Sequence, residues 1–251
     1  MATKILITND DGIDAPGIKV LNEGLVGLGE LTVVAPEREQ SASGHSLTLQ
    51  RPLRIVRRKP GCYVVDGTPT DCVFLGINHI MRQQKPGLVI SGINRGGNLG
   101  DDITYSGTVA AAFEATLLGI PAIAVSLEYK RDFHFATAAR VAREVAEKVL
   151  AHGMPADTLL NVNVPDLTWS ELAGFRVNRQ GKRCYSDVVC ENKDPRGRRY
   201  FWIGGEVLKG DDLAGTDAAD VKAGFVSITP IHLDLTNHRA LEPLRQWEWS
   251  I

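Results

Sequence analysis

Two adjacent carboxylates, Asp10 and Asp11, follow the first apolar run of the chain and precede Gly12. The run Lys4–Thr8 has the composition of a buried strand, so the pair is expected where that strand ends. In an open parallel sheet, ligands bind in the crevice outside the carboxyl ends of the strands. Two negative charges in such a crevice are costly unless a cation neutralises them. The pattern indicates a divalent cation, or, alternatively, a ligand-free turn at Asp11-Gly12 followed by a helix that Asp14 caps.

Further oxygen donors are expected at the ends of two other strands. Ser41 follows the second strand after a few loop residues, and Asn94 to Asn98 follow the strand Leu88–Ser91. Carboxylate, hydroxyl and amide oxygens suit Mg²⁺, Mn²⁺ or Ca²⁺, and no His or Cys cluster has zinc spacing. The plainer interpretations are a solvated loop hydroxyl for Ser41 and a self-bonded glycine-rich turn for Asn94 to Asn98.

Ser106, Gly107 and Thr108 open an alanine-rich helix. A helix N-terminus presents free N–H groups and a positive dipole end, which suits a phosphate group, and the glycine permits close approach. A Ser or Thr N-cap explains the same residues without a ligand. Beside a hard-cation site, however, an anion cradle is typical of phosphate-ester hydrolysis.

Strands and helices alternate through the first half, which predicts a Rossmann-like, doubly wound, mostly parallel α/β sheet. The expected strands are Lys4–Thr8, Leu31–Ala35, Leu53–Arg57, Tyr63–Val65, Leu88–Ser91, Ala122–Ser126 and Thr158–Val164. The expected helices include Gly17–Leu28, Thr108–Leu118 and Phe133–His152. A further helix is expected to be capped by Thr70 or Asp71 and to run to about Met81. A glycine-rich loop is expected from Gly92 to Gly107.

The second half contains a predicted hairpin, Arg183 to Glu206, around the turn signal Asn192–Gly197, with Tyr185, Tyr200, Phe201 and Trp202 on its arms. Because a two-stranded ribbon is marginal alone, it should pack on a partner subunit or on its own domain. Further strands are expected at Phe175–Arg179 and Val226–Thr229, and further helices at Asp217–Ala223 and Leu241–Trp247. The chain is interpreted as one α/β domain over residues 1–251. Its core is expected at 1–180 and 215–235, its hairpin at 181–207 and its C-terminal tail at 236–251.

The composition and net charge of the chain argue against several classes of function. The 251 residues are 43% hydrophobic and 23% charged, with a formal net charge of −2. This charge gives no electrostatic footprint for nucleic acid or for an anionic membrane, and no apolar stretch is long enough to span a bilayer. The four cysteines lack C-x-x-C spacing, which favours reduced thiols and a cytoplasmic location.

Six motifs occur in order along the chain: Asn9-Asp10-Asp11-Gly12, Ser41-Ala42-Ser43-Gly44-His45-Ser46, Gly67-Thr68-Pro69-Thr70-Asp71-Cys72, Ser91-Gly92-Ile93-Asn94-Arg95-Gly96-Gly97-Asn98, Tyr105-Ser106-Gly107-Thr108 and Val226-Ser227-Ile228-Thr229-Pro230. From Lys4 to about Leu235 the sequence resembles the SurE family of metal-dependent 5′-nucleotidases. The resemblance implies that Asp10, Asp11, Ser41 and Asn94 bind one divalent cation per subunit, Mg²⁺ or Mn²⁺. It also implies that the phosphate is bordered by Asn9, Asn98, Ser106, Gly107 and Thr108.

The same resemblance implies that nucleoside 5′-monophosphates are hydrolysed, with 3′-nucleotides or short polyphosphate as further candidate substrates. It also implies a homodimer or homotetramer that exchanges C-terminal elements. In the mechanism we hypothesise, Asp10 or Asp11 orients or deprotonates a metal-bound water, and Asn98, Ser106 and the amides of Gly107 and Thr108 stabilise the phosphoryl oxygens.

Two alternatives to this mechanism are a non-catalytic nucleotide-binding module on the same fold and an aspartyl-phosphate phosphatase. The latter class spaces its carboxylates D-x-D, unlike the adjacent pair here. The nucleobase, the sugar and the roles of His45, Arg95 and His232 stay open at this level.

Overall fold

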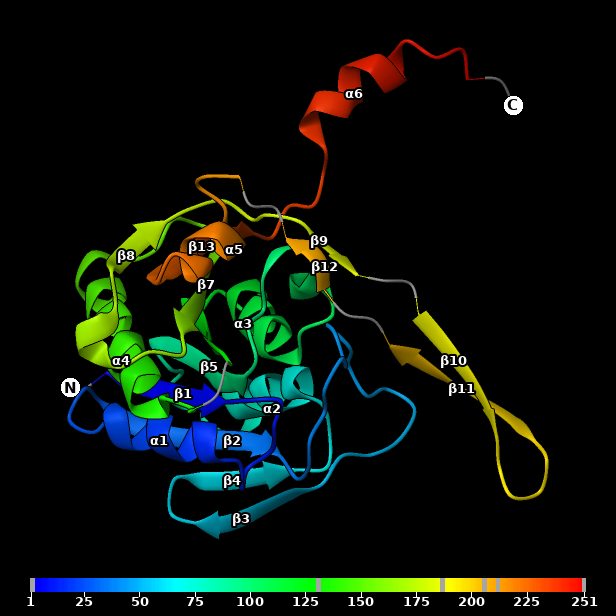
Figure 1. The fold of residues 1–251 in the computed structure, drawn as a ribbon. Coiled ribbons are helices and arrows are strands. Elements are labelled where there is room, and N and C mark those ends of the chain that lie inside the picture. The colour runs from blue at the N-terminus through cyan, green and yellow to red at the C-terminus, as the bar shows by residue number, and fades with distance from the viewer. Residues whose placement is uncertain (1–2, 130–131, 186–187, 205–206, 211–212, 250–251) are drawn as a thin grey trace.

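The structure, a computed structural model, describes residues 3–129, 132–185, 188–204, 207–210 and 213–249 (Figure 1). Its central sheet has nine strands: β1 (Lys4–Thr8), β2 (Glu30–Pro36), β3 (Ile55–Lys59), β4 (Cys62–Val65), β5 (Leu88–Arg95), β6 (Ala122–Glu128), β7 (Thr158–Pro165), β8 (Gly174–Val177) and β13 (Phe225–His232). The strand order is β3-β4-β2-β1-β5-β6-β7-β13-β8. The pairs β3–β4 and β7–β13 are antiparallel and the other neighbours are parallel, which confirms the mostly parallel sheet.

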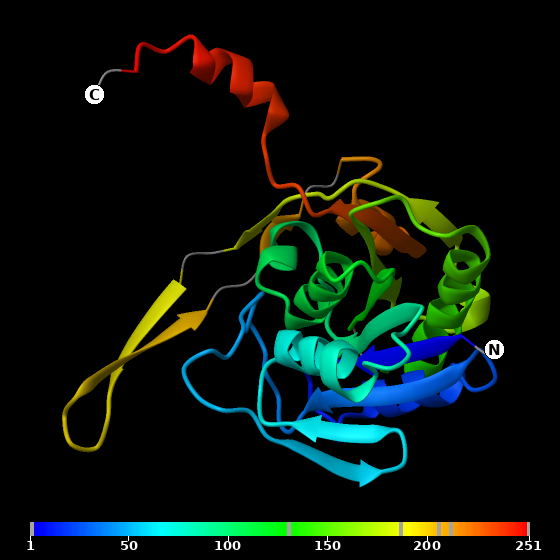
Figure 2. The same cartoon turned by 180° about the vertical axis from the view of Figure 1, so that it is seen from behind.

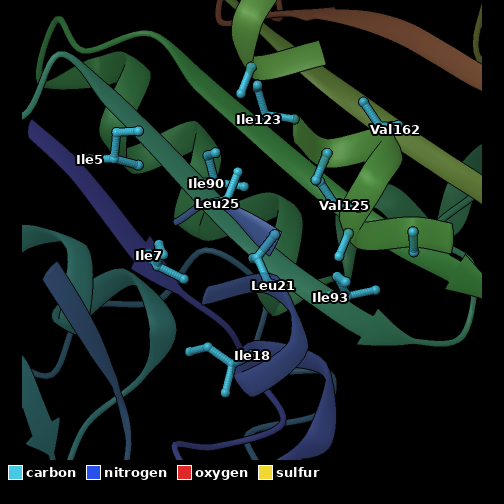
Figure 3. Close-up of a cluster of buried hydrophobic side chains, with 14 of the residues drawn as sticks. Ile5, Ile7, Ile18, Leu21, Leu25, Ile90, Ile93, Ile123, Val125 and Val162 are labelled. Atoms are coloured by element: carbon cyan, nitrogen blue, oxygen red, sulfur yellow. The ribbon is translucent and has the colours of Figure 1, made fainter. Parts of the chain in front are cut away.

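Helices cover both faces of the sheet, as a doubly wound fold requires. The helices α1 (Pro16–Gly24) and α4 (Phe135–His152) pack on one face with Ile5 and Ile7 of β1 (Figure 3). The helices α2 (Pro69–Leu75) and α3 (Gly107–Leu117) pack on the other face with Leu6. Successive β1 side chains therefore alternate between two apolar cores.

Strand β1 lies between β2 and β5. The chain leaves β1 toward β2 on one side, and from β5 it continues toward β6 on the other side. This reversal is the topological switch point at which doubly wound proteins bind ligands. The loops after β1, β2 and β5 therefore meet at one edge.

Helix beginnings differ from the sequence expectation. Thr68, rather than Thr70 or Asp71, caps α2, because Pro69 suits the first helical position and Asp71 completes a capping box by accepting from the Thr68 amide. The α-helix ends at Leu75 and continues as a π-helical turn, Gly76–Ile80, instead of running to Met81.

Asp14 does not cap α1. The N-cap is Ala15 and has no side-chain bond, whereas Asp14 pairs with Arg58 at 2.7 Å. The helix also ends at Gly24, short of the predicted Leu28.

The predicted loop from Gly92 to Gly107 is more ordered than expected. Strand β5 extends to Arg95, where it still pairs with β6, and a 3₁₀ helix forms at Gly100–Thr104. The terminal helix α6 covers His238–Arg245 rather than Leu241–Trp247, and α5 covers Asp217–Lys222.

An arm projects from the body of the molecule (Figures 1 and 2). Its outer part is the hairpin of β10 (Val188–Lys193) and β11 (Arg199–Gly204), and at its base β9 (Arg183–Tyr185) pairs with β12 (Val207–Gly210). The predicted hairpin is therefore present, although residues 186–187 and 205–206 lie outside the described residues. The strands β10 and β11 are exposed along their whole length, and α6 also points away from the body.

Polar contacts fasten the base of the arm to the body. Asp217 is fully buried, and its two oxygens accept from the amides of Gly100 (2.8 Å) and Gly181 (2.9 Å). Arg183 pairs with Asp102 at 2.9 Å and with Glu128 at 3.0 Å. Among the described residues, no helix is long and apolar enough to cross a membrane.

Candidate active site

A cleft of about 700 Å³ opens at the carboxyl edge of β1 and β5. Six of the nine predicted site residues line it: Asp10, Asp11, Ser41, Asn94, Asn98 and Ser106. The structure thus brings together loops that are separated by up to about a hundred residues in the sequence. The other three, Asn9, Gly107 and Thr108, do not line the cleft.

Asp10 is held by the first turn of α3. Its Oδ1 accepts a hydrogen bond from the Thr108 hydroxyl (2.5 Å), and its Oδ2 accepts one from the Thr108 amide (3.1 Å). Burial raises the pKa of Asp10, and the bonds from Thr108 act against that rise. Thr108 therefore supports the anionic form of Asp10 instead of offering its donors to the cleft.

Asp11 is less buried, and its Oδ2 accepts from the Arg95 amide at 3.2 Å. Burial, followed by the negative charge of Asp10, raises the pKa of Asp11 from 3.8 to about 6. The two carboxylates thus repel each other in a partly desolvated site. A cation between them would remove this repulsion.

Glu39 and Ser41 form the next part of the wall. The Ser41 hydroxyl donates to Glu39 Oε1 at 2.6 Å, and both residues line the cleft. The charge of Glu39 also raises the pKa of Asp10 and of Asp11. Glu39 therefore adds to the negative potential of the site.

Asn94 and Asn98 stand at the end of β5. The Asn94 side-chain amide donates to the Gly96 carbonyl at 2.8 Å, which leaves its side-chain oxygen as an acceptor. The Asn98 side-chain amide donates to Ser126 Oγ at 2.7 Å. Asn161 and Asn163 both donate to the Asn98 carbonyl, at 2.8 and 3.0 Å. Buried polar residues of β6 and β7 therefore fix the position of Asn98.

The start of α3 reaches the floor of the cleft. Ser106 is its N-cap and accepts from the Val109 amide at 3.1 Å. A Cβ on Gly107 would lie 2.9 Å from Asp10 Cβ and 2.8 Å from Ser43 Oγ, so a side chain at this position would push α3 away. The absence of a side chain at Gly107 lets the Asp10 carboxylate lie close to the start of α3, and the predicted approach of a phosphate to Gly107 stays a prediction.

Asn9 directly precedes the carboxylate pair in the chain. It is fully buried, and its side-chain amide donates to the Gly12 carbonyl at 2.9 Å. This bond braces the turn that carries Asp10 and Asp11. Among the described residues, Asn9 Oδ1 and Ser43 Oγ are buried without a hydrogen-bond partner.

The donor set fits a hard divalent cation. Two carboxylates, a hydroxyl and an amide oxygen face one cleft, and such oxygens suit Mg²⁺ or Mn²⁺ while leaving positions for water and substrate. Over the part of the chain that the structure describes, no group of three His, Cys, Asp or Glu side chains is placed to hold a metal. A cation held here would need neutral oxygen donors, such as those of Ser41 and Asn94, in addition to the carboxylate pair.

Comparison with known proteins decides the family. The family model described as survival protein SurE matches residues 5–187. The chain belongs to the SurE family. Proteins named 5′-nucleotidase SurE from Geobacter metallireducens and Geobacter sulfurreducens are 55% and 56% identical to it, each over 98% of this chain and over 98% and 94% of their own length. The crystal structure of the SurE protein from Aquifex aeolicus superimposes with a TM-score of 0.86 at 46% identity, covering 96% of this chain and 98% of that one.

Within this SurE-family chain, sequence reasoning missed Glu39 and the buried hydroxyl of Ser43. The sequence signal that could have found Glu39 is its position, as an acidic residue two places before Ser41. His45, left open by the sequence, pairs with Glu114 of α3 at 2.8 Å and does not line the cleft. It thereby ties the loop of Ser41 to α3.

The substitution Thr108→Val tests whether the Thr108 hydroxyl stabilises the Asp10 carboxylate. The substitution keeps the shape and removes the hydroxyl that donates to Asp10, so we expect a loss of about 1–3 kcal/mol in the free energy of unfolding and a roughly tenfold drop in turnover. Urea denaturation and steady-state kinetics measure the two effects. Thr108→Ser keeps the hydroxyl and should retain wild-type stability and turnover. A Thr108→Val protein with the stability and turnover of the wild type would contradict this role.

Proposed function

We propose that the protein is a divalent-metal-dependent 5′-nucleotidase that converts nucleoside 5′-monophosphates to nucleoside and phosphate. The observation that carries the proposal is the convergence of Asp10 and Asp11 with Ser41, Asn94 and the start of α3 in one cleft. The relatives named 5′-nucleotidase SurE, similar over nearly the whole chain, support the same activity.

Asp10, Asp11, Ser41 and Asn94 would hold the cation, Mg²⁺ or Mn²⁺. When bound, such an ion polarises the phosphoryl group and lowers the pKa of a coordinated water. Asp10 has both oxygens engaged by Thr108, which suits a fixed ligand. Asp11 accepts only the Arg95 amide on one oxygen and is closer to solvent, so we assign to Asp11 the task of orienting the attacking water and taking its proton.

The phosphate is expected to lie between Asn98 and Ser106. Both side chains line the cleft, and the Ser106 hydroxyl is free to donate because it is the acceptor in its N-cap bond. Donors aimed at developing negative charge stabilise the transition state. Thr108 and Gly107 contribute through Asp10 and the position of α3, rather than through direct contact.

Phosphate release from a panel of nucleoside 5′- and 3′-monophosphates and short polyphosphate, with Mg²⁺, Mn²⁺ or a chelator, tests the proposal. We expect metal-dependent release that is fastest with 5′-monophosphates. Metal-dependent binding of nucleotide without release would favour the non-catalytic module, and a trapped phosphoaspartate would favour the aspartyl-phosphate mechanism.

We also propose that the arm joins copies of the chain into a homodimer or homotetramer. Val189, Phe201, Trp202 and Ile203 are 62%, 57%, 67% and 92% exposed on its hairpin. Apolar side chains clustered on a projecting ribbon are typical of an interface, and an isolated ribbon is marginally stable.

The double variant Trp202→Glu with Ile203→Glu should dissociate the oligomer, because it places charge at the centre of the proposed apolar contact. Sedimentation velocity at micromolar concentration measures the change. Val177→Glu, at a residue 76% exposed on the sheet edge β8, is the matched control and should leave the assembly intact. A monomeric wild-type protein would contradict the interface.

The location of the protein stays a prediction from its cysteines. Cys62 and Cys72 are buried free thiols, and Cys190 is an exposed free thiol on the arm. Burial raises the pKa of the Cys72 thiol, which keeps it unreactive. We infer a reducing compartment, the cytoplasm, for this chain.

A further inference from the structure

Three aromatic rings form a continuous stack beside the cleft, hereafter the aromatic stack: Tyr129, Phe133 and Phe135. The Tyr129 and Phe133 ring centroids are 4.2 Å apart with planes 13° apart, and those of Phe133 and Phe135 are 5.8 Å apart with planes 12° apart. The Arg95 guanidinium lies over this stack, 4.5 Å from the Phe133 centroid and 5.7 Å from that of Tyr129.

A buried carboxylate builds the turn that carries Phe133. Asp166 accepts hydrogen bonds from the amides of Asp132, Phe133 and His134, at 3.1, 3.3 and 2.8 Å, and from His134 Nδ1 at 2.9 Å. Phe133 itself has a φ of 50°, a left-handed conformation that is rare for an aromatic residue. Strained residues of this kind persist where the surroundings over-determine them and are frequent at ligand sites.

The stack reaches the cleft through Phe135, one of its members, and through Arg95, which lies over the stack. Arg95 and Phe135 both line the cleft wall, and Tyr105, 68% exposed, contributes a further aromatic ring to the lining. The proposed metal and phosphate ligands are polar, whereas Arg95, Phe135 and Tyr105 offer flat apolar or π surfaces. The cleft therefore combines a phosphate-binding floor with a region suited to a planar ring.

We propose that Arg95, supported from behind by the aromatic stack, forms the surface on which the nucleobase of the substrate stacks. This inference rests on the proposed nucleotidase function and adds to it a base-binding subsite. Nucleobases stack on aromatic rings and on guanidinium planes, largely independently of their hydrogen-bonding edges. The subsite therefore favours nucleotides over phosphate esters without a ring and discriminates weakly among bases.

A direct phosphate contact is the rival role for Arg95. Its main-chain amide already donates to Asp11, while its guanidinium is drawn onto Phe133 on the aromatic side of the cleft. A guanidinium held on a ring presents a flat surface, and its lysine replacement would keep the charge but lose that surface. The two roles therefore predict opposite outcomes for Arg95→Lys.

The experiment compares kcat/KM for AMP and for ribose 5-phosphate, which has the sugar phosphate but no base. The wild-type ratio of AMP to ribose 5-phosphate should be well above one, and Arg95→Ala should lower the ratio about tenfold, the effect of losing one base-stacking contact. Arg95→Lys should lower it as much as Arg95→Ala, and Phe133→Leu should lower it in the same direction through KM rather than kcat. Adenosine, which carries no phosphate, should inhibit the wild type and should inhibit Arg95→Ala about tenfold less strongly.

Arg140→Ala is the matched control. The Arg140 guanidinium also lies over a ring, 3.7 Å from the centroid of Trp169, but does not line the cleft, so the ratio should be unchanged. A wild-type ratio near one, an equal loss of both substrates in Arg95→Ala, or recovery by Arg95→Lys would each overturn the base-stacking role. An enzyme inactive on all phosphate esters would instead refute the proposed function, and adenosine binding would still test the subsite.

Discussion

Replacing Asp11 by asparagine should lower kcat/KM for nucleoside monophosphates by about 10³-fold or more. The change removes one of two carboxylates from the proposed cation site and removes the proton acceptor for the attacking water, and general base catalysis alone is typically worth about 10²–10⁴-fold. Asparagine keeps the acceptor for the Arg95 amide, so the local backbone should be retained. Phosphate-release kinetics at saturating Mn²⁺ measure the loss.

Asp14→Asn is the control for this experiment. Asp14 is three positions away and exposed, and it pairs with Arg58 outside the cleft, so its activity should match the wild type. Circular dichroism should show that Asp11→Asn is folded. Near-normal turnover of Asp11→Asn would remove Asp11 from the mechanism.

Removing divalent cations should abolish turnover. The stability of the metal-free protein should then depend on pH, and the direction of this dependence follows from the pKa of Asp11. The pKa of Asp11 is about 6 in the folded protein and near 3.8 in the unfolded chain, so between these values the folded state binds more protons. The stability of the metal-free protein should therefore fall as pH rises from about 4 to about 6. Thermal unfolding in a chelator across this range measures the effect.

Adding Mn²⁺ at pH 7 should raise the unfolding temperature and restore turnover, because a ligand that binds only the folded state stabilises it. In Asp11→Asn, the fall in stability between pH 4 and 6 should shrink, since the titrating group is absent, and the response to Mn²⁺ should weaken. A wild-type enzyme that keeps full activity after exhaustive chelation would refute the cation site.

The proposed ligands could be located from the sequence because their positions depend on local signals. Short apolar runs mark buried strands, and parallel strands place their carboxyl ends at one edge, so Asp10, Asp11 and Asn94 had to meet if β1 and β5 were neighbours. The pairing of β1 with β5 confirms that condition. The family resemblance supplied the ligand assignments, which the geometry accommodates.

The task of Thr108 could not be predicted. A threonine at a helix start suits a cap or a phosphate contact, whereas its hydroxyl and amide donate to Asp10, 98 positions earlier in the sequence. The aromatic stack was hidden for the same reason, because Arg95 and Phe133 come from different elements and meet only in the folded chain. Helix starts were misplaced where a side-chain bond decided the cap, as at Thr68.

The single carboxylate of Asp217 accepts from the amide of Gly100, which lies between the cleft-lining residues Asn98 and Asp102, and from the amide of Gly181, which precedes the arm. The loop beside the cleft and the base of the arm thus share one buried hydrogen-bond acceptor. A substitution that removes the Asp217 carboxylate would therefore leave two buried backbone amides without their acceptor, one beside the cleft and one before the arm. One side chain thus couples the geometry of the cleft to that of the arm.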